Sequence, residues 1–216
     1  EFAAFPSAYM GLVQPDGALE LYDGQLKMVD ADGSFLELFD PTHYLEYIAE
    51  HVNPYTYLKA PYYKKRGYEH GIYRVGPLGR LNVATHISTP IAQSEMQIWK
   101  QLNGGKPVEG TLYYHYARLI ETIYALERVK ELLDDPDILG TDVATPFSHI
   151  TGEGVGVLEA PRGTLFHHYW TDEQGIIQRV NMIVATAGNA WAMNHAVNMV
   201  AKRYVDGTKL TEGMLN

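Results

Sequence analysis

The residues with the clearest chemical potential lie near position 160, where the sequence reads Glu-Ala-Pro-Arg-Gly-Thr over residues 159–164. Proline fixes one backbone angle and glycine permits a tight reversal, so Pro161 and Gly163 present Arg162 at the tip of a turn. Arginine carries a permanent charge and five donors in a planar fork. The residue types leave two alternatives open: Arg162 binds an anionic ligand, or it forms a structural ion pair with a carboxylate.

Other patterns that suggest a site fail on their spacing. The sequence has nine histidines, but none form a helical pair four residues apart, and the neighbours His167 and His168 point to opposite faces of a predicted strand. The glycines of residues 152–156 precede a strand, whereas a dinucleotide loop follows one; we interpret them as a strand-entry loop. Residues 30–33 have their glycine at the wrong position for a calcium loop and are interpreted as a hairpin turn. The sequence has no motif typical of hydrolases.

The composition excludes several classes of protein. The 216 residues include no cysteine, so disulfides, cysteine-bound zinc, iron–sulfur ligation and a thiol nucleophile are excluded within them. A formal net charge of -9 argues against a nucleic-acid partner, and the basic run at residues 64–66 is interpreted as a solvated loop tip. The chain is 46% hydrophobic without an apolar run long enough to span a bilayer, so we expect a globular chain and no membrane segment.

The periodicity of apolar residues predicts an α+β fold, with a β-meander and hairpins, several helices and one long central helix. We expect residues 1–216 to form a single unit. Within the long helix, Leu119, Ile123 and Leu126 are expected to be buried. The predicted elements are a three-strand meander over residues 18–39, helices over 41–52, 89–105, 111–134 and 190–205, strands over 154–159, 164–170 and 176–184, and a long Tyr-rich loop over 53–85.

Four stretches carry a resemblance that runs the whole length of the chain. They are residues 5–13 with Phe-Pro-Ser and Met-Gly-Leu-Val, residues 71–78 (Gly-Ile-Tyr-Arg-Val-Gly-Pro-Leu), residues 113–121 (Tyr-Tyr-His-Tyr-Ala-Arg-Leu-Ile-Glu), and residues 154–168 followed by Ile-Val-Ala-Thr-Ala-Gly-Asn at 183–189. In this order they resemble the large subunit of nickel–iron hydrogenases, in particular the cytosolic branch. That branch includes NAD-linked bidirectional enzymes and coenzyme-F420-non-reducing enzymes.

The resemblance implies an activity and a cofactor. In the family, a nickel–iron centre with cyanide and carbon monoxide on the iron splits hydrogen heterolytically, and two cysteine pairs hold the metals. Neither pair is present, so we expect an internal segment of the large subunit that is inactive alone and whose residues bind no metal directly. The resemblance implies that Arg162 is a catalytic residue beside the metals and that Thr186 donates its hydroxyl to an iron-bound cyanide. Pro161 and Ala185 are expected to line the same pocket.

The resemblance also implies partners and leaves rivals. The expected partners are further electron-transfer subunits and an iron–sulfur small subunit, and the expected location is the cytoplasm. One alternative is the quinone-site subunit of respiratory NADH dehydrogenase, a relative without the metal-binding cysteines, although it typically carries lysine at the position of Arg162. The other alternative is an interaction module without a redox role, for which the Tyr-rich region 53–85 would serve as an interface.

Overall fold

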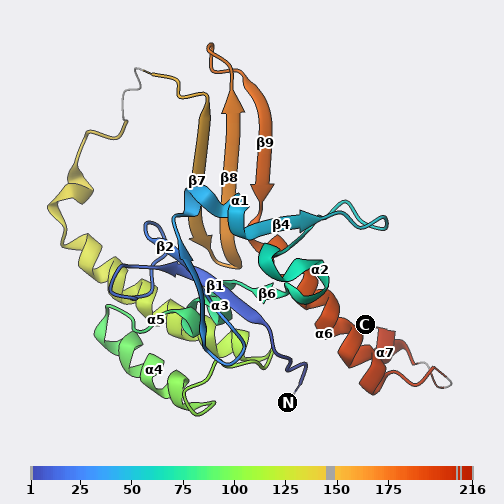
Figure 1. Ribbon diagram of the computed structural model, residues 1–216. Helices are drawn as coiled ribbons and strands as arrows, with labels where there is room; N and C mark the ends of the chain where they lie inside the picture. The colour runs from blue at the N-terminus through green and yellow to red at the C-terminus, as the bar shows by residue number, and fades with distance from the viewer. Residues whose placement is uncertain (1, 145–148, 208, 210, 216) are drawn as a thin grey trace.

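The computed structural model describes residues 2–144, 149–207, 209 and 211–215 of the chain. Two groups of long elements lie at opposite ends of the molecule (Figure 1). One is the antiparallel sheet of β7 (Glu153–Ala160), β8 (Gly163–Thr171) and β9 (Ile177–Ile183). These strands confirm the three that the sequence predicted. Strand β7 begins earlier than expected, within residues 152–156, which were interpreted as a strand-entry loop. The other is the helix pair α4 (Pro90–Gln101) and α5 (Tyr113–Leu133), also as predicted; α5, with 21 residues, is the longest described helix.

A four-stranded sheet lies between these groups. Its order is β3-β2-β1-β6, with β1 (Ala8–Val13), β2 (Gln25–Val29), β3 (Phe35–Phe39) and β6 (Tyr73–Arg74). The hairpin turn at residues 30–33 is confirmed, and Gly33 has a φ of 88°, which favours glycine. The predicted meander is wrong in its first strand, because Ala18 and Leu19 form only isolated bridges. Side-chain oxygens of Asp16 and Glu20 bind the backbone N–H groups of this segment and replace a ladder.

The predicted helix over residues 41–52 is wrong beyond Tyr47. Asp40 caps the segment as expected, since its side chain accepts from the backbone of Thr42. The helical part is limited to η1 (Pro41–His43) and α1 (Tyr44–Tyr47), after which β4 (Ile48–His51) pairs antiparallel with β5 (Ala60–Tyr63). Pairing with the next strand along the chain overrides the helical spacing, and the β-branched Ile48 suits a strand.

The expected long loop over residues 53–85 contains several short elements instead. Besides β5 and β6 it forms η2 (Lys64–Arg66), α2 (Gly67–His70) and α3 (Gly76–Val83). The basic run predicted as a solvated tip is exposed as expected but has the form of η2. All eight residues of α3 are buried, so the helix has no polar face and shows no amphipathic period. That lack of a period explains why the sequence did not reveal it.

The apolar residues from which α5 was predicted are not the ones that pack against the core. Leu119 and Leu126 are 64% and 65% exposed and Ile123 is half-buried, so the predicted burial of this trio is wrong. The buried positions are Ala117, Ile120 and Tyr124. The same correction holds for α4, where the apolar residues that indicated the helix are exposed and the buried ones are Ala92, Met96 and Trp99.

The chain beyond β9 turns back across the core. It forms η4 (Ala185–Asn189) and then α6 (Ala190–Tyr204), as predicted for residues 190–205, and it ends with α7 (Glu212–Leu215). A further short helix, η3 (Pro136–Leu139), follows α5. Among the described residues, no helix combines the length and the apolarity that crossing a bilayer requires.

Strand β1 divides the apolar core into two clusters. All six of its residues are buried. Tyr9 and Val13 point into a cluster built largely from α3, α4 and α5, whereas Met10 and Leu12 point into a cluster that includes Phe166 of β8. This alternation follows from the two-residue repeat of a strand. Because it is covered on both faces, β1 is the centre of the fold.

A buried ion cluster connects the elements around β1. The guanidinium of Arg80 in α3 donates from Nε and Nη2 to Glu121 of α5, at 2.5 and 2.7 Å, and from Nη1 to Glu159 of β7, at 2.7 Å. The other oxygen of Glu159 accepts from the Leu12 backbone and the Thr164 hydroxyl. Burial raises the pKa of Glu159 above its ordinary value, and the nearby Arg80 opposes that rise. Five separate elements, α3, α5, β7, β1 and β8, therefore meet at one guanidinium and its two carboxylates.

Replacing Arg80 should be strongly destabilising. Arg80→Leu leaves two acidic side chains without their cation, and breaking a buried pair in this way costs roughly 3 to 5 kcal/mol. The control is Arg66→Leu, which breaks the more exposed pair with Asp30 and should change the free energy of unfolding by at most about 1 kcal/mol. Urea unfolding of both variants measures the difference. Equal losses in the two variants would show that the cluster is not a special source of stability.

Candidate functional site

Arg162 lies in the tight connection between β7 and β8. Ala160 and Gly163 form the last paired residues of the two strands, so Pro161 and Arg162 make the turn, as the sequence predicted. Gly163 has a φ of 154°, and a Cβ there would lie 2.3 Å from Val75 Cγ2, so this position requires glycine. No residue that the structure describes forms a hydrogen bond or an ion pair with the Arg162 guanidinium. The described chain therefore offers no carboxylate for the structural alternative.

The Arg162 side chain lines a cavity of about 750 Å³. Thr186 lines the same cavity, and it lies within η4 rather than at the end of a strand. Its hydroxyl likewise has no hydrogen-bond partner among the described residues. An apolar part of the lining comes from α6, with Ala192, Met193, Ala196, Val197 and Val200. Two donors from distant parts of the sequence thus face one largely apolar space.

Pro161 and Ala185, which the resemblance implies as pocket residues, lie next to the β7–β8 connection. Neither lines the cavity in the part of the chain that is described. The Pro161 carbonyl accepts from Arg118 Nη1 at 3.0 Å. Ala185 is buried, and its carbonyl lies close behind Gly163. The two residues support the turn from behind rather than forming the surface of the cavity.

Two further arginines line the cavity and were not singled out by sequence reasoning. Arg74 is 2% exposed and donates to Ser7 Oγ at 2.7 Å, to the Tyr9 hydroxyl at 2.6 Å and to the carbonyls of Phe5 and Glu109. Its position in the apolar strand β6 was a usable signal, since a buried charge needs partners. The sequence gave no indication that Arg118 of α5 lines the cavity, because its contact is with the turn about forty residues further along the chain.

Asn189 connects the turn to the rest of the site. It was predicted to cap α6, but no side-chain capping bond forms. Instead its Nδ2 donates to the Arg162 carbonyl at 3.1 Å, and its Oδ1 accepts from the Val75 backbone at 2.9 Å and from the Tyr114 hydroxyl at 3.2 Å. Burial raises the pKa of Tyr114, so its hydroxyl stays neutral and can donate.

The donors in this cavity suit an anionic or strongly accepting ligand. Arg162 and Thr186 are both exposed, so their donors are open to solvent and to a ligand that enters the cavity. The described residues include no group of three or more histidine or acidic side chains that could hold a metal ion, and the sequence has no cysteine. The cavity therefore has the donors that surround a bound group but not the ligands that would hold a metal.

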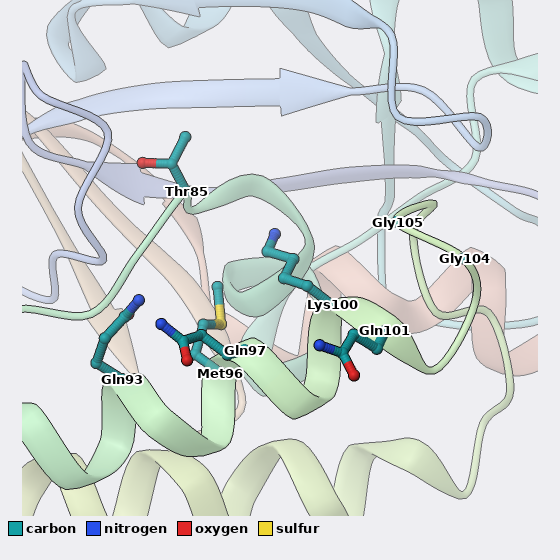
Figure 2. A pocket seen from close by; sticks show the side chains of 8 residues that line it. All are labelled: Thr85, Gln93, Met96, Gln97, Lys100, Gln101, Gly104 and Gly105. Atoms are coloured by element: carbon teal, nitrogen blue, oxygen red, sulfur yellow. The ribbon is translucent and has the colours of Figure 1, made fainter.

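A second cavity, of about 460 Å³, lies beside α4 and is lined by Gln93, Gln97 and Lys100 among others (Figure 2). The Lys100 ammonium donates to the carbonyls of Leu81 and Ala84 at 3.0 and 2.7 Å, at the end of α3. A cation at the C-terminal end of a helix stabilises its unpaired carbonyls. This geometry explains Lys100 as a helix cap without a ligand.

Comparison with known proteins identifies the family of the chain. Residues 20–203 match the nickel-dependent hydrogenase family, and the chain belongs to that family. It is 46% identical over 194 residues to a vhu-type F420-non-reducing hydrogenase subunit of Methanococcus voltae, covering 90% of this chain and 46% of the relative. It is 44% identical to the NAD-reducing hydrogenase HoxS subunit beta of Cupriavidus necator, covering 100% of this chain and 45% of the relative.

A solved structure supports the same family and shows the same fold. That of an NAD+-reducing [NiFe]-hydrogenase in the H2-reduced state superposes with a TM-score of 0.91 and 38% identity, covering 98% of this chain and 47% of the other. These matches confirm the predicted family and the α+β fold, and they decide against the quinone-site subunit. The chain spans about half the length of the relatives it matches.

The burial of Lys100 should make the stability of the chain depend on pH. Burial lowers the pKa of Lys100 from 10.5 to about 8, with a smaller contribution from Lys27. Between these values the unfolded chain binds more protons than the folded chain, so the free energy of unfolding should rise with pH. Urea titrations from about pH 7 to about pH 10 should show this rise in wild type and in the exposed-site control Lys106→Met, but not in Lys100→Met. Parallel curves for all three proteins would contradict the assignment.

Proposed function

We propose that residues 1–216 are a segment of the catalytic large subunit of a nickel–iron hydrogenase, which oxidises hydrogen reversibly to protons and electrons. The observation that carries the proposal is that Arg162 and Thr186, two donors without protein partners among the described residues, face one cavity in a chain of the nickel-dependent hydrogenase family. The relatives named above include NAD-reducing and F420-non-reducing enzymes, so the electron acceptor depends on other subunits. An iron–sulfur small subunit, further electron-transfer subunits and a cytoplasmic location complete the proposal.

The residues fit the surroundings of a nickel–iron group with cyanide and carbon monoxide ligands. When bound, this group supplies the heterolytic cleavage of hydrogen. The planar fork of Arg162 can donate to an anionic ligand nitrogen, and the Thr186 hydroxyl can donate to a second one. The apolar residues of α6 provide a non-polar lining beside these donors, and the fixed charge of Arg162 stabilises negative charge in the cavity. Cysteine ligands for the metals must come from residues outside this sequence.

The 216-residue chain by itself should bind neither nickel nor iron stoichiometrically and should show no hydrogen uptake. Soft thiolate ligands are absent from it, and the described histidines and carboxylates form no cluster that could replace them. Elemental analysis of the purified chain should give close to zero nickel. A large subunit that also contains the cysteine pairs of the family serves as the positive control. About one nickel per chain in the 216-residue protein would disprove this prediction.

The role of Arg162 can be tested in the complete enzyme that contains this segment. Arg162→Lys keeps the charge but loses the planar fork, so turnover per nickel should fall at least ~100-fold, the scale observed when one preorganised donor is removed. Because the guanidinium has no partner among the described residues, the melting temperature should stay close to that of wild type. The control is Arg128→Lys, an exposed position on α5 paired with Glu131, which should leave activity unchanged. Near-normal turnover with a clearly lowered melting temperature would overturn the assignment.

A further inference from the structure

The buried amide of Asn189 forms a bridge between the two donors of the cavity. We propose that Asn189 is a positioning residue that fixes the place of Arg162 relative to Thr186. Asn189 is 8% exposed and lies in η4, three residues after Thr186. Its Nδ2 donates to the carbonyl of Arg162 at 3.1 Å. One side chain therefore joins the segment that carries the hydroxyl to the turn that carries the guanidinium. The inference rests on the function proposed above.

The hydrogen-bond partners fix the orientation of this amide. Its oxygen faces the Val75 backbone N–H, and its nitrogen faces the Arg162 carbonyl. The Tyr114 hydroxyl lies 3.2 Å from the amide oxygen, but its single proton can also point to the Val75 carbonyl at 3.1 Å. A flipped amide would place N–H against N–H and oxygen against oxygen, so one orientation is favoured. The direction of each bond is therefore set, and a side chain that cannot donate towards Arg162 cannot replace asparagine.

Close packing of three segments makes the bridge rigid. A Cβ at Gly76 would lie 2.6 Å from the Arg162 carbonyl oxygen, and a Cβ at Gly163 would lie 2.8 Å from the Ala185 carbonyl oxygen. Gly188 approaches Val75 equally closely, since a Cβ there would lie 2.9 Å from Val75 Cγ2. The start of α3, the β7–β8 turn and η4 are therefore in backbone contact, and the turn cannot shift without moving its neighbours.

The side chain of Arg162 depends on this anchor. Because no described residue holds the guanidinium, the anchors of Arg162 among the described residues act on its backbone, and they fix the point from which its side chain extends. A displacement of about 1 Å at a reacting group can cost ~100-fold in rate. Loss of the Asn189 bond should therefore reduce activity through the position of Arg162, beyond any effect on stability.

The test compares two chemically identical substitutions in the complete enzyme. Asn189→Asp keeps the acceptor for Val75 but places an acceptor against the Arg162 carbonyl. The matched control is Asn82→Asp: Asn82 is also 8% exposed, accepts from the Val108 backbone and donates to its carbonyl, both at 3.0 Å, and does not line the cavity. Both variants lose one buried donor, so their melting temperatures should fall by similar amounts.

Turnover per nickel should separate the two variants. We expect Asn189→Asp to lose ~10-fold to ~100-fold and Asn82→Asp to stay close to wild type. Two readouts do not depend on activity: the rate at which phenylglyoxal labels Arg162, measured by mass spectrometry, and the infrared bands of the cyanide ligands. Both should change in Asn189→Asp and stay unchanged in Asn82→Asp. Unchanged labelling and unchanged turnover per nickel in Asn189→Asp would overturn the inference.

A pH series and a second variant exclude a trivial loss of folding. Burial raises the pKa of an introduced carboxyl, and the protonated form can donate to Arg162 again. The activity of Asn189→Asp relative to wild type should therefore rise as the pH falls, whereas the uncharged Asn189→Leu should show no such recovery. Recovery in both variants, or in neither, contradicts the proposal. If Arg162→Lys is fully active, the proposed function fails; if only Asn189→Asp is fully active, this inference alone fails.

Discussion

The architecture depends on the burial of one guanidinium between two carboxylates. Arg80 lies in a helix with no solvent-exposed face, so its charge is tolerable only because Glu121 and Glu159 supply acceptors from α5 and β7. Glu159 in turn holds the backbone of β1 at Leu12 and the hydroxyl of Thr164 on β8. The two core clusters on either side of β1 are thereby fixed relative to the three-stranded sheet.

The same cluster extends to the candidate site through the backbone of the β7–β8 turn. Three successive carbonyls there each accept from a different side chain: Ala160 from Arg80, Pro161 from Arg118 and Arg162 from Asn189. Carbonyls in a tight turn lack the full set of ladder partners, and buried ones must be satisfied in another way. Donors from α3, α5 and η4 meet this need, so the turn is held from three directions while the side chain at its tip stays free.

The sequence was informative where one side of an element faces solvent or where a short motif is diagnostic. The strands β7–β9 and the helices α4 and α5 were predictable from the pattern of their apolar residues, α6 from a cap expected at Asn189, and the turn at Arg162 from its proline and glycine. The fully buried α3 and the strand β4 were not, because the first has no polar face and the second is defined by pairing. Leu119 and Leu126 show the reverse error: their spacing indicates an apolar contact, but no packed partner for them lies in the described part of the chain. The hydrogen bond from Asn189 to Arg162 could not be predicted, because the two residues are 27 positions apart in the sequence.

A comparison among the arginines clarifies what the site is built to do. Arg80 and Arg74 are buried and use their donors on the chain's own acceptors, and Arg118 is bound to the turn. The buried charges of Arg80 and Arg74 are therefore committed to the structure, whereas the exposed Arg118 uses one nitrogen on a single carbonyl. Arg162 is exposed at the edge of the largely apolar cavity, and alone among these four it has no acceptor from the described residues. The donors of Arg162 are therefore open to an acceptor from outside the described chain, which is what the proposed function requires of this residue.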